Sequence, residues 1–266
     1  MKQKKILSKK ILTKKKPEKG LLLTLKRRAG RGSSGRITVR HKGGGVKKRY
    51  RIVDFDQKKI NIPAKVVALE YDPYRTSFII LLEYEDKDKR YRLAPDNIKI
   101  GDSVICSEKA EIKTGNRMRI FNVPVGTAVH DIELIPEKGG KIVRSAGNSA
   151  RVLAHEDKFT NLEMPSGEIR RVLSRCYATI GAVSYPEWRY VNIGKAGNNR
   201  LRGKRPRVRG SAMNPVDHPH GGGEGRTSIG LKHPKTPWGK PALGVKTRKR
   251  KKWTNKYIIS RRKKKK

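Results

Sequence analysis

Apolar residues in the middle of the chain form short runs that turn-forming residues separate. Between residues 51 and 112 the runs are rich in β-branched and aromatic residues, and Asp-Pro, Glu-Asp-Lys-Asp and Gly-Asp sequences punctuate them. These features are typical of β-strands. A charged turn joins two of the runs into an expected hairpin, and the spacing of the set predicts a small antiparallel barrel. The predicted strands are RIVDF (51–55), AKVVALEY (64–71), SFIILLEYE (77–85), KRYRLA (89–94) and DSVIC (102–106).

A second set of apolar runs follows, with its own turns at Pro-Glu-Lys-Gly-Gly and Pro-Ser-Gly sequences. Its predicted strands are AVHDIELI (128–135), KIVRSA (141–146), ARVLAHE (150–156), GEIRRVLS (167–174) and ATIGAV (178–183). No run keeps a 3.6-residue period over three turns, so we expect few and short helices.

The two sets of strands predict a mainly β fold with two small barrels, because closure buries sheet edges. We expect an OB-like barrel at residues 51–114 and an SH3-like barrel at residues 115–190. The flanking residues 1–50 and 191–266 are predicted to be long, basic and largely irregular N- and C-terminal extensions.

Charge is distributed very unevenly between these parts. The 266 residues include 66 Lys and Arg against 23 Asp and Glu, a formal charge of +43. Residues 52–187 hold 21 basic and 20 acidic residues, whereas the rest of the chain holds 45 basic and 3 acidic ones. Such cationic segments repel themselves and indicate a polyanionic partner, with nucleic acid the leading class. We expect them to become ordered only when that partner neutralises them.

A membrane-spanning protein and a disulfide-stabilised protein are both disfavoured. Leu21–Leu23 is the longest apolar run near the N-terminus, far below the ~20 residues that a span needs. Cys106 and Cys176 have no CxxC spacing and are interpreted as reduced, partly buried thiols of a cytosolic protein.

The C-terminal extension has the composition of a segment that a partner shapes. Residues 206–244 contain six Pro and eight Gly, which deny the backbone the donors and dihedral angles of regular structure. The last 21 residues contain 13 basic residues and no acidic one. Trp253, Tyr257, Ile258 and Ile259 interrupt that charge, as expected of a tail that passes between phosphates and stacks or wedges an occasional side chain.

The N-terminal extension ends in GRITVRHKGGGVKKRY, residues 35–50, where three glycines between basic residues let the backbone approach an anion. A nucleotide-binding P-loop is excluded, because GK[ST] and a strand-then-helix context are missing. In this run we expect RNA binding by Arg36, Arg40, His41, Lys42, Gly43, Gly44, Gly45, Lys47, Lys48 and Arg49. Later in the chain we expect phosphate contacts from Arg200, Arg202, Lys204, Arg205, Arg207 and Arg209.

The segment MNPVDHPHGGGEGR, residues 213–226, allows three interpretations. Asp217, His218, His220 and Glu224 are residue types that bind metals, but a hydrolytic zinc site needs three oriented ligands. A dyad of Asp217 and His218 needs a nucleophile and a scaffold that the segment lacks. The favoured interpretation is a preformed RNA-recognition loop, because prolines reduce the entropy lost on ordering and glycines allow close approach. Its predicted RNA-binding residues are Asn214, Asp217, His218, His220, Gly221, Gly222, Gly223 and Arg226.

This segment resembles the signature of large-subunit ribosomal protein two, the bacterial and organellar L-two family. Other segments along nearly the whole chain also resemble segments of this family, and they occur in the same order as in the family. They are GRITVRHKGGG (35–45), YRIVDF (50–55), LEYDPYR (69–75), RYRLAP (90–95), NVPVGTAVHDIEL (122–134), GGKIVRSAG (139–147), SGEIRRV (166–172), GKAGNNR (194–200), RPRVRG (205–210) and HPKTPWGKPALG (233–244). The resemblance departs at Val46, where the family usually has histidine, and at Leu201, where it usually has tryptophan.

The resemblance implies an OB-like and an SH3-like barrel with extensions buried in large-subunit rRNA. It implies a structural constituent of the large ribosomal subunit that supports subunit association, tRNA placement and the peptidyl transferase region. His218 matches a family histidine proposed to assist peptidyl transfer; we interpret its role as structural and expect no enzyme activity. Other ribosomal proteins and small-subunit rRNA across the subunit interface are the further implied partners, with no membrane.

Two other function classes stay open at the level of sequence. The first is a general nucleic-acid-compacting basic protein, which would bind duplex DNA as well as structured RNA. The second is a metal-dependent phosphoesterase built on His218, His220 and Asp217. For the ribosomal interpretation we expect no cofactor of the protein's own, apart from structural Mg²⁺ held by the RNA. We expect a cytoplasmic ribosome, bacterial in the first instance and plastid or other organelle as the alternative.

Overall fold

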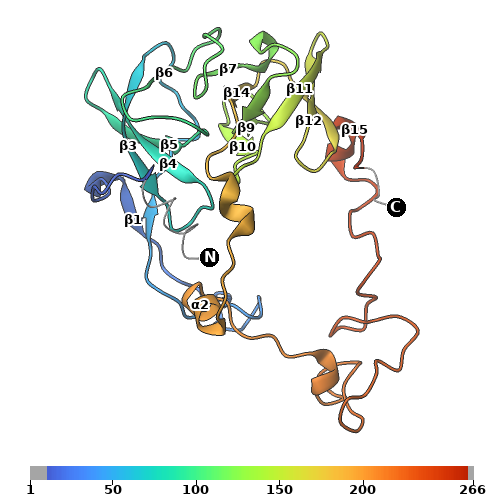
Figure 1. Cartoon of the computed structure of the whole chain (residues 1–266). Helices are drawn as coiled ribbons and strands as arrows, with labels where there is room; N and C mark the ends of the chain where they lie inside the picture. The colour runs from blue at the N-terminus through green and yellow to red at the C-terminus, as the bar shows by residue number, and fades with distance from the viewer. Residues whose placement is uncertain (1–10, 263–266) are drawn as a thin grey trace. The chain divides into compact units, whose positions relative to one another are not determined.

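The structure is a computed structural model that describes residues 11–262 (Figure 1). These residues divide into two compact units. Unit 1 combines residues 11–25, Lys48–Asn192 and residues 254–262, and unit 2 combines Lys26–Lys47 with Ile193–Trp253. Strands account for 29% of the chain and helices for 10%, so the predicted mainly β fold is confirmed. One sheet curls into a half-barrel, which is consistent with the OB-like and SH3-like prediction.

The first sheet of unit 1 is antiparallel and has the strand order β5-β4-β3-β6. Its strands are β3 (Ala64–Tyr71), β4 (Phe78–Tyr84), β5 (Lys89–Leu93) and β6 (Ser103–Val104). The hairpin of β4 and β5 is the one predicted from the charged turn, with Ile79 opposite Leu93 and Glu83 opposite Lys89.

The continuous apolar run in β4 reflects burial on both faces of the sheet. Ile80 and Leu82 belong to one core cluster, whereas Ile79 and Leu81 belong to another that includes Tyr91. Because successive side chains of a strand point to opposite faces, a strand that is buried on both faces needs apolar residues at every position.

A small N-terminal sheet adds to unit 1, and it corrects one prediction. The strands β1 (Leu22–Thr24) and β2 (Arg49–Arg51) pair antiparallel. The predicted strand at residues 51–55 is therefore displaced toward the N-terminus. Beyond β2, Val53 makes only an isolated bridge to Tyr91 and packs beside it in the core.

The second sheet has the strand order β15-β13-β12-β11-β8-β14-β7, with every neighbouring pair antiparallel. The strands are β7 (Arg117–Arg119), β8 (Ala128–His130), β11 (Ala150–His155), β12 (Phe159–Glu163), β13 (Ile169–Leu173), β14 (Tyr177–Ile180) and β15 (Ile258–Ser260). A separate short ladder pairs β9 (Ile132–Glu133) with β10 (Gly140–Ile142). The hydrophobic core packed against the second sheet includes Met118, Val129, Ile132, Val152 and Leu162.

Strand β15 shows that part of the predicted irregular C-terminal extension belongs to the second sheet. Arg170 of β13 pairs with Ile258, and the rings of Phe159 and Tyr257 lie 6.2 Å apart. Figure 1 shows β15, in red, beside the yellow-green strands of the second sheet. Tyr257 and Ile258 are therefore half-buried parts of unit 1, whereas Trp253 and Ile259 are exposed.

Helices are short, as predicted. They are the 3-10 helices η1 (Lys19–Leu21), η2 (Ile120–Asn122), η3 (Pro186–Tyr190), η4 (Gly210–Ala212) and η5 (Trp253–Tyr257), and the α-helix α2 (Ala196–Leu201). No helix within residues 11–262 has the length and apolarity of a membrane span. Cys106 and Cys176 are free and fully buried, and burial raises the pKa of both thiols, that of Cys176 to about 12.

Candidate nucleic-acid interface

Unit 2 is built from two segments that lie far apart in the sequence and pair through their backbones. An isolated antiparallel bridge joins Lys42 to Lys204. Next to it, the Gly43 N–H donates to the Gly203 carbonyl at 3.0 Å. The two basic runs that the sequence marks as RNA-binding therefore meet in one ladder, a pairing that no local sequence signal predicts.

The imidazole of His41 extends this ladder. The Arg205 N–H donates to the His41 carbonyl at 3.0 Å, and His41 Nδ1 donates to the Pro206 carbonyl at 3.0 Å. A carbonyl can only accept, so the Nδ1 of His41 carries a proton. The ring is thus oriented by hydrogen bonds within the protein.

The glycines of the GGG run allow two backbones to approach each other. Gly45 has a φ of +93°, and a Cβ there would lie 2.8 Å from both the Gly203 nitrogen and the Leu201 oxygen. Arg27 Nη1 donates to the Gly44 and Gly45 carbonyls at 2.9 and 2.7 Å. The sequence suggested that glycine lets the backbone approach an anion. The structure adds that Gly45 lets the backbone approach residues 201–203 of the same chain.

Most of the side chains predicted to bind RNA are exposed. Within unit 2 the exposed residues are Arg36, Arg40, Lys42, Gly44, Gly45, Lys47, Arg202, Lys204, Arg205, Arg207, Arg209, Asn214, Asp217, Gly223 and Arg226. Half-buried are His41, Gly43, Arg200, His220, Gly221 and Gly222. Lys48 and Arg49 lie in unit 1, the first half-buried and the second exposed.

Unit 2 has a very large excess of cations. Its sequence contains 25 Lys and Arg and only two acidic residues, Asp217 and Glu224. Two carboxylates cannot neutralise that many cations, so the charge must be balanced by something outside the chain. Phosphate groups of a nucleic acid are the partner for which such a surface is suited.

The segment 213–226 is a loop that its own backbone hydrogen bonds hold in shape. The His218 N–H donates to the Asn214 carbonyl at 3.2 Å, and the Gly221 N–H donates to the His218 carbonyl at 2.8 Å. The Gly222 N–H donates to the Met213 carbonyl at 3.0 Å and closes the loop. A preformed loop loses less entropy on binding than a flexible one.

His218 lies inside this loop. Its side chain is 7% exposed, and Nδ1 accepts the His220 N–H at 3.0 Å. Gly210 packs against the ring so closely that a Cβ at that position would lie 2.5 Å from Cε1 and Nδ1. His218 therefore packs inside the loop, which gives the interpretation of its role as structural a physical basis. Its contact with RNA stays a prediction.

The two histidines of the loop use the lone pairs that a metal would need. His218 Nδ1 accepts the His220 N–H, and His220 Nε2 accepts the Lys235 N–H at 2.8 Å. Each neutral ring then carries its proton on the other nitrogen. Within the described part of the chain, no three His, Cys, Asp or Glu side chains are grouped as metal ligands.

Comparison with protein families decides the assignment. The model described as "Ribosomal Proteins L2, RNA binding N-terminal domain" matches residues 18–106. The model described as "Ribosomal Proteins L2, C-terminal domain" matches residues 113–239. The chain belongs to the ribosomal protein L2 family. Membership in the L2 family makes it a structural, RNA-binding protein of the large ribosomal subunit.

The two departures from the L2 pattern lie next to each other in unit 2. The Val46 N–H donates to the Leu201 carbonyl at 3.0 Å. Both side chains are exposed, to 53% and 56%. Where the L2 resemblance leads us to expect histidine and tryptophan, this chain presents two aliphatic side chains on paired segments, so the two departures concern one local surface.

An exposed tryptophan adds a candidate site residue that the sequence analysis did not single out. The Thr236 N–H donates to the Lys240 carbonyl at 2.7 Å and closes a tight turn, in which Trp238 is 75% exposed. The guanidinium of Arg40 lies 5.7 Å from the centroid of its ring. An exposed indole among cations is suited to stack on a nucleobase. The signal was present in the sequence as Trp in a Thr-Pro-Trp-Gly turn.

Proposed function

We propose that this L2-family chain binds large-subunit rRNA mainly through unit 2, and that it thereby supports subunit association, tRNA placement and the peptidyl transferase region. The observation that carries the proposal is the excess of 25 basic over two acidic residues in unit 2, on segments held in shape by backbone hydrogen bonds. Other ribosomal proteins and small-subunit rRNA across the subunit interface are the further proposed partners.

The exposed Lys and Arg side chains neutralise rRNA phosphates that would otherwise repel one another. Phosphate contacts set position and affinity, whereas contacts to bases and 2′-hydroxyls set specificity. Asn214 and Trp238 are placed for the second kind of contact, because both are exposed on stretches whose backbones are hydrogen-bonded. Mg²⁺ held by the RNA is compatible with Asp217 and Glu224, the two carboxylates of unit 2.

No chemical step is assigned to the protein. The lone pair of His218 Nδ1 is engaged by the His220 N–H, and the ring is buried, so His218 supports the shape of the loop rather than a proton transfer. The proposed location is the cytoplasmic ribosome, with an organellar ribosome as the alternative.

Salt dependence of rRNA binding tests the proposal. If a dozen cations contact phosphate, log K falls with log salt at a slope of about −8 to −11. A slope near zero would contradict the proposal. Competition with duplex DNA distinguishes it from general nucleic-acid compaction: structured large-subunit rRNA should bind in preference, and equal binding of both competitors would favour the compacting function.

Retention in the large subunit gives a second test. The protein should copurify with the large ribosomal subunit through a high-salt wash. The loop at residues 213–226 and the paired segments around Lys42 and Lys204 add contacts that do not depend on charge alone. Complete release at the salt concentration that strips nonspecifically bound basic proteins would contradict the proposed role.

A further inference from the structure

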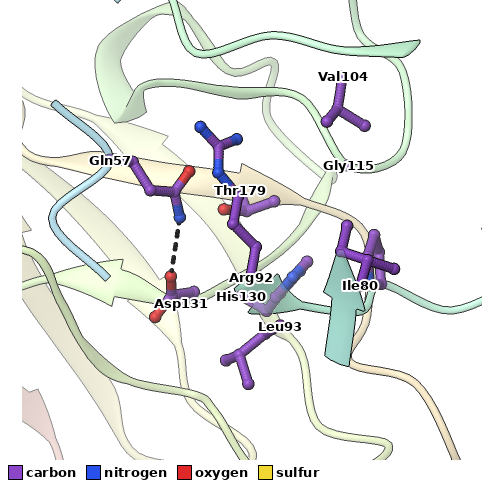
Figure 2. A pocket seen from close by; sticks show the side chains of 10 residues that line it. Gln57, Ile80, Arg92, Leu93, Val104, Gly115, His130, Asp131 and Thr179 are labelled. Carbon is purple, nitrogen blue, oxygen red and sulfur yellow. Dashed lines mark hydrogen bonds between the residues drawn. The ribbon is translucent and has the colours of Figure 1, made fainter. Parts of the chain in front are cut away.

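A small cavity lies inside unit 1. Its volume is about 10 Å³. Arg92 of β5 lines it from the first sheet, and His130 of β8 and Thr179 of β14 line it from the second sheet. Gln57, from the segment between β2 and β3, and Asp131 complete its polar wall, as Figure 2 shows. The cavity therefore lies where the two sheets of unit 1 meet.

Buried polar atoms without protein partners gather around this cavity. Gln57 Oε1, Arg92 Nε, Arg92 Nη1, His130 Nε2 and Asp131 Oδ1 have no hydrogen-bond partner among the described residues. Gln57 and Arg92 are each 4% exposed, Asp131 is 2% exposed and His130 is 1% exposed. Native proteins almost always satisfy such groups, by protein atoms or by an ordered internal molecule. Several polar atoms without hydrogen-bond partners around one cavity indicate that they share a bound ligand.

The neighbouring hydrogen bonds define what the ligand must donate and accept. His130 Nδ1 lies 2.9 Å from the Gly181 carbonyl, which can only accept, so Nδ1 carries the proton and Nε2 is an acceptor. Gln57 Nε2 donates to Asp131 Oδ2 at 3.3 Å, which leaves Gln57 Oε1 as a second acceptor. Arg92 Nη2 donates to the Tyr84 hydroxyl at 2.7 Å, which leaves Nε–H and Nη1–H as donors.

We propose that this cavity is a binding site for one water molecule. The water accepts a hydrogen bond from Arg92 and donates hydrogen bonds to Gln57 Oε1 and His130 Nε2. Water is suited to it because water both donates and accepts two hydrogen bonds. A halide can accept from Arg92 but has no proton for the two acceptors. Among the described residues, no three His, Cys, Asp or Glu side chains are grouped as metal ligands. The cavity volume is about that of a single water site.

The bound water joins the two sheets of unit 1. Arg92 belongs to the first sheet and His130 to the second, so a water held by both acts as a hydrogen-bonded bridge between them. Burial lowers the pKa of His130 to about 4, which keeps the ring neutral at pH 7 and its Nε2 available as an acceptor. The other charged groups around the site are Asp131, Arg117, Glu133 and Arg144.

A crystal structure of the full chain, at a resolution that shows ordered water, tests this site. The expected result is one density peak at about 2.7–3.2 Å from a free Arg92 nitrogen and from Gln57 Oε1 or His130 Nε2. Direct pairing of these groups with an empty cavity would overturn the proposal. An anomalous peak at the same place in crystals soaked in bromide would also overturn it, because it would identify an anion site.

Two variants separate the water site from a general change of packing. Arg92→Met removes both donors and should abolish the peak. Tyr84→Phe removes the other partner of the same guanidinium but leaves the cavity wall intact, and the peak should persist. A peak that persists in Arg92→Met would overturn the assignment. The structure of the unmodified chain decides the question by itself if Arg92→Met does not fold.

Discussion

The guanidinium of Arg117 donates to the carboxylate of Glu133 at 2.9 Å, and both side chains are only 1% exposed. Arg117 comes from β7 and Glu133 from β9, so the pair connects two strands that share no ladder. The second guanidinium nitrogen donates to the Asp131 carbonyl at 3.0 Å. A charge that is buried so completely is stable only while its partners remain.

Arg117→Met should strongly destabilise unit 1. The substitution leaves Glu133 buried without its counter-ion, and loss of one partner of a buried pair costs about 3–5 kcal/mol. Urea unfolding of the full chain, followed by circular dichroism, measures the change in the free energy of unfolding.

Arg119→Met is the matched control, because Arg119 is on the same strand and pairs with Glu108 at the surface. Exposed pairs contribute less than about 1 kcal/mol. Equal destabilisation by the two substitutions would show that the burial of Arg117 has no special importance.

Two neighbouring residues should give opposite contributions to the pH dependence of stability. Burial raises the pKa of Asp131 to about 6, although Arg117 opposes the change, and burial lowers the pKa of His130 to about 4. Unfolded Asp and His titrate near 3.9 and 6.5, as a rough guide. Between about pH 4 and 6 the folded Asp131 binds more protons than the unfolded one, so its contribution to stability falls as pH rises. The contribution of His130 rises over the same window.

Single substitutions should reveal each contribution. In His130→Asn, which can still donate to the Gly181 carbonyl, the free energy of unfolding should change more negatively with rising pH than in the parent protein. In Asp131→Asn it should change more positively. Urea unfolding at several values between pH 4 and 6 measures both slopes. Unchanged slopes in the two variants would contradict the buried titrations.

His218 should act through the shape of its loop. Asn at this position can keep an acceptor near that of Nδ1 for the His220 N–H, whereas Leu cannot. We therefore expect His218→Asn to retain most large-subunit assembly and His218→Leu to lose it, as measured by sedimentation of ribosomal subunits. If His218→Asn subunits assemble fully but transfer peptides much more slowly, the histidine has a role beyond packing.

Much of the fold could be predicted because the strands are bounded by local signals. The run AKVVALEY covers the same residues as β3, and KRYRLA differs from β5 by one residue. The strand β12 was missed, since its apolar residues are few and its strand character depends on pairing with β11 and β13. Tyr257 and Ile258 were assigned to an RNA-binding tail because nothing local reveals that β13 accepts a further strand.

The candidate interface shows the same limit. Charge and the signature loop identified the basic segments, since both are properties of short stretches of sequence. The bridge between Lys42 and Lys204 joins residues that are far apart in the sequence, and the burial of His218 depends on Gly210. These features follow from tertiary contacts. The sequence marked His218 as important and left its orientation undetermined.

Gly222→Val should impair assembly more than it impairs the stability of unit 1. Gly222 has a φ of +84°, and a Cβ there would lie 2.8 Å from Pro215 Cγ, so a branched side chain distorts the loop. Gly197→Ala is the control, because that glycine has room for a Cβ and lies in α2 of the same unit. Sedimentation profiles should show fewer complete large subunits for Gly222→Val alone, with unchanged urea unfolding of the strands. Normal profiles for Gly222→Val would remove the loop from the proposed interface.

Substitution of exposed cations in unit 2 should reduce the salt dependence of rRNA binding. Replacement of Lys204, Arg207 and Arg209 by Ala removes up to three phosphate contacts, and each contact contributes roughly 0.7–0.9 to the slope of log K against log salt. The slope should therefore become about 2–3 smaller in magnitude. The matched control replaces three exposed lysines of unit 1, Lys87, Lys109 and Lys138, whose surroundings are of mixed charge. Both triple variants lose the same net charge, so a simple effect of total charge would change both slopes equally. A change confined to the first variant assigns the RNA contacts to unit 2, because only contacts that release counterions from the nucleic acid alter the slope.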